Sequence, residues 1–333
     1  MPTEPSIYKL INHPYYLLIS KYIDACGFKI ARYSVREALR KVDGSFDLSK
    51  LNEILTSFFS DLLVIQIDEK VEDLSAIITP CFLLHRNENQ FSIYVVLKIE
   101  NDKVLIFEQD KKEHTISVDE FQNLIKTSIL IFKEEETYIP SEKILKEYNK
   151  EQEEDQNYRD NIQVIDNFIS DKECENLISF CEESDLFKRS VIMASESDQK
   201  HSAHRTSSSA MMEINQSVSI IINLKKKIAS FLNINIDKIE KLQCVRYYKS
   251  EGFKPHFDSY VKKRKLTCLL YLNDGFVGGE TYFPEVDFRV TPKKGSLLIF
   301  QNLDDDNELI TQSFHEGSPL LESVKYACNI WIE

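Results

Sequence analysis

The sequence lacks a long hydrophobic run: no stretch of about 18 consecutive apolar residues occurs, so no segment is expected to span a membrane. Glycine and proline, which dominate fibrous and many disordered chains, number only 8 and 9 in 333 residues. The opening segment, MPTEPSIYKL, does not have the basic and then apolar order of a secretory signal, which favours a cytoplasmic location. These absences leave an ordinary globular protein that is long enough for two domains.

Paired cysteine motifs and an excess of basic charge are also missing. The seven cysteines are odd in number and widely spaced, and no CxxC pair occurs, which argues against a disulfide framework or a structural zinc site. The formal net charge is −13 at pH 7, and basic residues cluster only at 225–227 and 262–265. Because neutralisation of phosphates supplies most non-specific affinity for nucleic acid, we expect no nucleic-acid partner. No feature of the sequence indicates an oligomeric state.

An acidic segment separates two regions with regular patterns. Between 136 and 160 the chain is rich in Glu and Asp and poor in large apolar side chains, which predicts a partly helical linker. Before it, apolar residues recur at helical spacing over 15–25 and 48–59, and short β-branched or aromatic segments follow between 62 and 132. Helices followed by strands predict an α+β domain over 1–135.

The region 161–333 has a different order of elements. Amphipathic helices are predicted over 171–183 and 215–232. From residue 242 onward the sequence consists of short strand-like segments such as LTCLLYL and SLLIFQNL. This order predicts an antiparallel β-sandwich braced by helices.

Two histidines and a carboxylate in this region have the character of metal ligands. His256 and Asp258 are two residues apart in GFKPHFDSY, so on an extended strand both side chains leave the same face. His315 follows in QSFHEGSPL. Two histidines and one carboxylate can hold Fe(II) and leave positions open for an oxidant and a co-substrate, although the same spacing also occurs between unrelated histidines. Lys325, ten residues after His315, could pair with a carboxylate of such a co-substrate.

Four sequence blocks in the same region resemble one family. They are QCVRYYKSEGFKPHFD, LTCLLYLND, GGETYFPEVDFRVTPKKGSLLIFQN and HEGSPLLESVKYACNIWI. Their order and spacing are similar to those of the prolyl 4-hydroxylase group of Fe(II)/2-oxoglutarate-dependent dioxygenases, over about residues 161–333. The resemblance implies a double-stranded β-helix, or jelly-roll, braced by helices. It also implies an enzyme that couples decarboxylation of 2-oxoglutarate to hydroxylation of a C–H bond, with Fe(II), 2-oxoglutarate, O2 and ascorbate as cofactors.

The resemblance assigns roles to individual residues. The residues that would bind iron are His256, Asp258 and His315. Lys325 would pair with the distal carboxylate of 2-oxoglutarate, and Tyr247 and Thr281 match positions with which the family holds the same co-substrate. The physical reason is coherent, because a carboxylate in a buried pocket needs a cation and hydroxyl donors.

The segment SAHRTSSSAMM resembles the Arg-x-Ser segment that prolyl hydroxylases place near the substrate groove. Arg205 and Ser207 stand at its matching positions, so the resemblance implies that they bind substrate. The hydrophobic residue that usually closes the segment is here Met211 or Met212, which departs from the family pattern. A serine-rich polar loop without a role is the alternative.

The N-terminal region resembles a second family. PYYLLISKYIDACGFKI, VREALRKVDGSFDLSKLNEIL, IYVVLKIENDKVLIFEQD and HTISVDEFQNLIKTSILIFKE are similar in order to the papain-like leader-peptidase domain of peptide-exporting ABC transporters, over about 10–135. The nucleophile position falls near Pro14 and the base position near Ile93, and neither residue can perform that chemistry. The resemblance therefore implies a papain-like α+β domain without peptidase activity.

A degenerate peptidase domain can keep a peptide groove, because binding and bond cleavage are separable. We expect residues 1–135 to bind the leader of a ribosomally made precursor peptide, and tethering to raise the concentration of its core at the iron site. A structural or dimerising role is the alternative. The predicted activity is hydroxylation of a peptide or protein side chain, with proline as the leading candidate. Hydroxylation of another residue or of a free amino acid stays open, as does a peptide-binding regulatory module without turnover.

Overall fold

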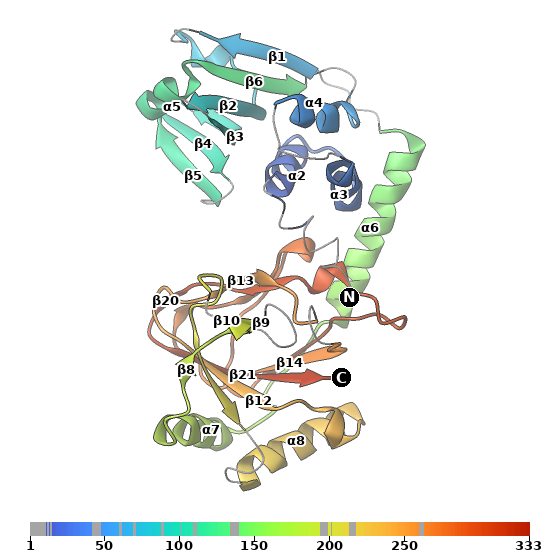
Figure 1. Cartoon of the computed structure of the whole chain (residues 1–333), viewed down its shortest axis with the longest axis vertical. Coiled ribbons are helices and arrows are strands. Elements are labelled where there is room, and N and C mark those ends of the chain that lie inside the picture. Colours follow the sequence, from blue (N-terminus) through green and yellow to red (C-terminus); the bar gives the residue numbers. More distant parts are fainter. Residues whose placement is uncertain are drawn as a thin grey trace. The chain divides into compact units, whose positions relative to one another are not determined.

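The chain divides into two compact units, Met1–Glu153 and Glu154–Glu333 (Figure 1). The computed structural model describes residues 11, 13, 15–41, 48–59, 62–68, 71–87, 90–100, 102–108, 112–133, 140–193, 199–200, 202–212, 218–259 and 263–333. The division falls within helix α6 (Glu142–Asn161), which lies in the segment expected as the acidic linker. None of the helices in the described part of the chain has the length and apolar character needed to cross a bilayer.

Unit 1 combines helices with one antiparallel sheet. Its helices are α2 (Tyr16–Ala25), α3 (Arg32–Arg40), α4 (Leu48–Thr56) and α5 (Val118–Ile125). Its strands are β1 (Leu62–Ile67), β2 (Cys81–Asn87), β3 (Gln90–Glu100), β4 (Lys103–Glu108), β5 (Lys112–Ser117) and β6 (Ser128–Lys133). The sheet order is β1-β6-β2-β3-β4-β5. The structure confirms the predicted order of helices followed by strands.

Helices pack against both faces of the sheet of unit 1. Alternate residues of a strand point to opposite faces, so neighbouring residues of β2 contact different helices. Leu83 of β2 belongs to a core that includes Phe121 and Ile125 of α5. The neighbouring Phe82 contacts Tyr22 of α2, with 4.5 Å between the ring centroids. Helix α5 begins at a capping box between Ser117 and Glu120, which satisfies backbone N–H groups that would otherwise lack partners.

Helix α6 contributes to unit 1 through a buried carboxylate. Glu151 is 7% exposed and accepts hydrogen bonds from the backbone N–H groups of Arg32 at 2.8 Å and Tyr33 at 3.1 Å. An anion at the N-terminus of α3 is favourable, because the helix dipole and the free N–H groups both attract negative charge. The first half of α6 is thereby fixed to α3, which the acidic composition of 136–160 did not predict.

Unit 2 contains two antiparallel sheets that share a core. The larger sheet consists, in order, of β7 (Gln163–Ile165), β18 (Leu297–Gln301), β14 (Leu266–Tyr271), β21 (Lys325–Ile332), β12 (Leu242–Tyr247), β11 (Ser208–Met212) and β8 (Lys188–Arg189). The smaller sheet consists of β13 (Phe253–His256), β19 (His315–Gly317), β16 (Thr281–Phe283) and β17 (Phe288–Val290). Two short pairs are β9 (Ile192–Met193) with β10 (Gln199–Lys200), and β15 (Val277–Gly278) with β20 (Leu320–Glu322).

Helices α7 (Asp171–Glu183) and α8 (Val218–Leu232) lie on one side of the larger sheet (Figure 1). Their apolar residues pack on a core to which this sheet contributes Cys328 and Ile330 of β21. Ala327, which directly precedes Cys328, faces the core between the two sheets instead. The arrangement is consistent with the jelly-roll that was expected for this region. Alternation along β21 also places Lys325 and Asn329 with Ala327 in the space between the sheets.

Gly295 occupies a turn beside the larger sheet in which a side chain would be unfavourable. Its φ is +77°, its N–H donates to the carbonyl of Tyr271 at 2.9 Å, and its carbonyl accepts from the N–H of Ile169 at 3.1 Å. A Cβ at this position would overlap with the carbonyl oxygen of Ile169.

We expect Gly295→Ala to destabilise unit 2 by about 1–2 kcal/mol from the left-handed backbone and by about a further 1–3 kcal/mol from displacement of Ile169. Gly275→Ala is the matched control, because its φ is +79° but a Cβ there would meet no atom within 4 Å. Urea unfolding of the two variants measures the difference. Equal destabilisation would show that the contact with Ile169 does not matter.

Candidate metal centre and co-substrate pocket

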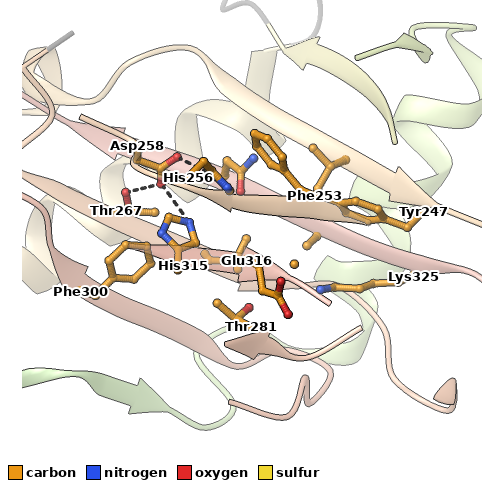
Figure 2. A pocket seen from close by; sticks show the side chains of 15 residues that line it. Tyr247, Phe253, His256, Asp258, Thr267, Thr281, Phe300, His315, Glu316 and Lys325 are labelled. Atoms are coloured by element: carbon orange, nitrogen blue, oxygen red, sulfur yellow. Dashed lines mark hydrogen bonds and ion pairs between the residues drawn. The ribbon is translucent and has the colours of Figure 1, made fainter. Parts of the chain in front are cut away.

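The three predicted metal ligands lie together at the smaller sheet. His256 ends β13, His315 begins β19, and the pairing of these antiparallel strands sets the two histidines directly opposite one another. Asp258 follows β13 by two residues. One potential ligand atom from each of the three side chains lies within 4.8 Å of the others. Figure 2 shows the three side chains gathered at one end of a pocket and Lys325 at the other.

Hydrogen bonds fix which nitrogen of each histidine faces the cluster. Nδ1 of His256 lies 2.9 Å from the carbonyl of Lys254, and Nδ1 of His315 lies 2.8 Å from the carbonyl of Ser313. A carbonyl only accepts, so both Nδ1 atoms carry a proton, and Nε2 is the nitrogen of each ring that is left to bind a metal ion. These Nε2 atoms lie 3.7 and 3.8 Å from the carboxylate oxygens of Asp258. Such orientation by a backbone carbonyl is typical of histidines that bind metal ions.

The electrostatics of the cluster favour the protonation states that a metal needs. Burial would raise the pKa of Asp258, but His256, His315 and Arg264 outweigh it and hold this pKa well below its usual range. Burial, and then the nearby His256, lower the pKa of His315 to about 4. At neutral pH the cluster therefore offers an ionised carboxylate and a neutral imidazole, the forms that coordinate divalent ions. The donor set fits an iron ion.

Aromatic rings pack against both histidines. The ring of Phe253 stacks on His256 with 3.5 Å between centroids and an interplanar angle of 18°. Phe300 lies edge-on to His315, with 4.8 Å between centroids. These rings exclude water from one side of the cluster and limit rotation of the imidazoles.

Arg205 and Ser207, the expected substrate residues, lie one layer behind the cluster. Arg205 is 5% exposed, its guanidinium lies 4.8 Å from the Phe253 ring centroid, and its Nε donates to the Ser207 hydroxyl at 3.2 Å. Its Nη2 donates to Oε1 of Gln243 at 2.8 Å. Neither residue is among those that line the pocket. The structure therefore brings them to the back of Phe253.

The far end of the pocket holds a buried ammonium. Lys325 is 4% exposed, and its Nζ donates to the carbonyl of Gly279 at 2.6 Å. The rings of Tyr247 and Tyr271 each lie 5.5 Å away. Burial lowers the pKa of Lys325 to about 8, against an attraction by Glu280 that raises it. Within the described part of the chain, no carboxylate forms an ion pair with this ammonium.

Tyr247 and Thr281 flank Lys325, as expected for a shared site. Tyr247 is the register partner of Lys325 between β12 and β21. The Thr281 hydroxyl lies 2.8 Å from that of Tyr271, so one hydroxyl donates to the other. The cavity between the metal cluster and Lys325 has a volume of about 40 Å³. A cation, hydroxyl groups and a metal cluster along one cavity fit a dicarboxylate that reaches the metal with one end and Lys325 with the other.

Three further residues at this site escaped the sequence analysis. Thr267 donates to Oδ2 of Asp258 at 2.7 Å, and Arg264 donates to the backbone carbonyl of Asp258 at 3.2 Å. Glu316 lines the pocket beside His315. Thr267 carried a usable signal, because it is a polar residue on the same face of a strand as Leu269 and Tyr271, both of which point between the sheets. The sequence around Arg264 and Glu316 gave no such indication.

A two-sheet antiparallel fold with a cluster of two histidines and one carboxylate is typical of non-haem Fe(II) oxygenases. Residues 242–333 match the sequence pattern of the family described as the 2OG-Fe(II) oxygenase superfamily. The probable prolyl 4-hydroxylase 3 of Arabidopsis thaliana is 30% identical over 196 residues, which cover 51% of this chain and 68% of that protein. The putative prolyl 4-hydroxylase of Acanthamoeba polyphaga mimivirus is 28% identical over 182 residues, which cover 50% and 72%.

Among solved structures, the viral collagen prolyl hydroxylase of Paramecium bursaria Chlorella virus-1, in its complex with 2OG, is 27% identical. It covers 51% of this chain and 94% of its own, with a TM-score of 0.42. The chain spans about two thirds of the length of the curated relatives. It belongs to the 2OG-Fe(II) oxygenase superfamily, among its prolyl 4-hydroxylase-like enzymes. This family uses Fe(II), 2-oxoglutarate and O2, and ascorbate is a typical addition.

Proposed function

We propose that the protein hydroxylates a side chain of a peptide or protein, and that this residue is proline. The observation that carries the proposal is the placement of a His/Asp/His cluster and the buried Lys325 at opposite ends of one cavity. The names of the curated relatives support proline as the target. Bound Fe(II), with 2-oxoglutarate and O2, would supply the oxidising power for an unactivated C–H bond.

In this proposal, each part of the pocket has one task. His256, Asp258 and His315 hold the metal. Lys325, with Tyr247 and Thr281, holds the distal carboxylate of 2-oxoglutarate. We propose that Arg205 and Ser207 act on the substrate indirectly. They support the ring of Phe253, which lines the pocket beside the metal cluster. A dry pocket strengthens the charge interactions within it.

The direct test is succinate formation from 2-oxoglutarate with Fe(II), ascorbate and air, with proline-containing and other peptides, followed by mass spectrometry. We expect peptide-stimulated succinate formation, a mass gain of one oxygen atom on proline, and loss of both in His315→Ala. His204→Ala is the control, because this histidine is exposed and lies outside the cluster. Retained turnover in His315→Ala would reject the ligand assignment, and a mass gain on another residue would reject proline.

The pKa of Lys325 predicts how the apparent KM for 2-oxoglutarate depends on pH. Below pH about 8 the ammonium is charged and attracts a carboxylate, and above it the charge is lost. The KM is therefore expected to rise by about tenfold per pH unit above pH 8. In Lys325→Met the KM should be about 10- to 100-fold higher at pH 7, the value of a hydrogen bond to a charged group, without the rise above pH 8. Steady-state succinate assays between pH 6.5 and 9.5 measure both, and an unchanged KM in the variant would exclude this role.

We further propose that unit 1 binds the leader of a precursor peptide whose core is hydroxylated by unit 2. A cavity of about 490 Å³ supports this, because it is large enough for several side chains. It lies among α3, α4 and the start of α6. Its apolar lining is Ala38, Ile54, Phe58 and Ile144, and its charged lining is Glu37, Glu53 and Glu147 together with Lys41 and Lys143. An amphipathic segment with polar or charged side chains on one face would match this mixed lining.

Full-length protein is expected to bind a leader-bearing precursor at least about tenfold more tightly than the core alone, a difference of about 1.4 kcal/mol. Ala38→Trp should remove this difference, because the indole would fill the cavity. Leu17→Trp is the control, since Leu17 is 45% exposed on α2 and does not line the cavity. Fluorescence polarisation with labelled peptides measures both. Equal binding of precursor and core by the unmodified protein would count against leader recognition.

The cysteines support a proposed location in the cytoplasm. All seven are free thiols, and six of them are buried. Free thiols persist in a reducing compartment.

A further inference from the structure

The Asp258 carboxylate accepts the last of two buried hydrogen bonds in series, which no sequence motif indicated. Oγ1 of Thr267 lies 2.7 Å from Oδ2 of Asp258, and Nδ2 of Asn302 lies 2.9 Å from the same Oγ1. Thr267 is 2% exposed and Asn302 is completely buried. Figure 2 shows the Thr267 hydroxyl directed at Asp258 from the side away from Lys325.

The two hydrogen bonds can run in only one direction, from Asn302 through Thr267 to Asp258. An ionised carboxylate only accepts, so the single hydroxyl proton of Thr267 must be donated to Asp258. The Thr267 oxygen then accepts a hydrogen bond, and in the Asn302 side chain only the amide nitrogen can donate it. Oδ1 of Asn302 is buried without a hydrogen-bond partner among the described residues, so this amide satisfies the hydroxyl at the expense of its own oxygen.

The backbone of Asp258 is fixed from another direction. Arg264 donates to its carbonyl at 3.2 Å and is itself held by Glu240, at 2.7 and 3.1 Å, and by the face of Trp331, 3.7 Å from the ring centroid. With the main chain held in this way, rotation of the side chain is the freedom that remains to the Asp258 carboxylate. The hydrogen bond from Thr267 removes that rotation.

We propose that Thr267, held by Asn302, is a positioning residue that fixes the rotation of the Asp258 carboxylate and keeps it a monodentate metal ligand. Oδ1 lies 3.7 Å from Nε2 of His256 and Oδ2 lies 3.8 Å from Nε2 of His315, so both oxygens face the cluster, and the Thr267 hydroxyl uses a lone pair of Oδ2 that a metal ion would otherwise share. A carboxylate free to rotate can bind through both oxygens and fill a fourth position. 2-Oxoglutarate and O2 need the three positions that the two histidines and one carboxylate oxygen leave open. This inference rests on the proposed function, since it assigns Asp258 to the metal.

Thr267→Val removes the hydroxyl with little change of shape, and Thr267→Ser keeps it. The test uses the full chain, loaded without oxygen, and measures Mn(II) affinity by titration, the absorption spectrum of the Co(II) form, and the Fe(II)-dependent absorption band that appears when 2-oxoglutarate is added. Thr267→Val should keep its affinity for Mn(II) within about threefold but bind 2-oxoglutarate about 10- to 100-fold more weakly, a loss of the size that outer-shell residues contribute to the activity of metal sites. Its Co(II) spectrum should change, and Thr267→Ser should restore both properties.

The inference is overturned if Thr267→Val binds 2-oxoglutarate like the unmodified protein, or if the serine and valine variants are impaired equally. Failure of the unmodified protein to bind metal or 2-oxoglutarate would instead reject the proposed function. Asn302→Leu is the replacement variant for this test if Thr267→Val does not fold. It releases the Thr267 hydroxyl, and it should weaken 2-oxoglutarate binding in the same direction but less. An unchanged affinity in a folded Asn302→Leu protein would reject the part assigned to Asn302.

Discussion

The alternation of side chains along the central strands of the larger sheet is the constraint on which unit 2 depends. In β14, β18 and β21, one row of residues packs beneath α7 and α8, and the other row enters the space between the sheets. The second row includes Lys325 and Thr267, one at each end of the cavity. A shift of one residue in the pairing of any of these strands would exchange the two rows, because side chains alternate strictly. The apolar packing of the outer row therefore also determines the position of the polar site.

Two buried charges of opposite sign are the main cost of this arrangement. Lys325 is 4% exposed and the side chain of Asp258 is 9% exposed, and an unpaired charge so far from water is unfavourable by several kcal/mol. Asp258 is stabilised by Thr267 and by the neighbouring imidazoles, and its pKa falls. Lys325 has one carbonyl and two ring faces, and its pKa falls as well, which means that its charge is poorly compensated. The asymmetry matches a site in which the anionic ligand at Lys325 comes from outside the chain.

Much of the site could be predicted from the sequence, because it depends on local spacing. His256 and Asp258 are two residues apart and reach the same cluster, although β13 ends at His256 and Asp258 lies in the turn that follows. The four ordered blocks identified the family. Residues whose role depends on a distant strand could not be predicted. Arg264 belongs to the basic cluster 262–265, and nothing in the sequence indicates that its guanidinium is paired with Glu240 and stacked on Trp331. Burial of Glu151 likewise depends on α3, more than 100 residues earlier in the chain.

The two ends of the cavity are carried by different sheets, and this gives the pocket its length. The histidines belong to β13 and β19 of the smaller sheet, whereas Lys325 belongs to β21 of the larger one. Facing sheets pack about 10 Å apart, a spacing that the apolar side chains between them fix. The distance from the metal ligands to the ammonium is thus set by the apolar and aromatic packing between the sheets. In the proposed function, a dicarboxylate is selected by its length as well as by its charge, and ligands that are shorter leave Lys325 unpaired.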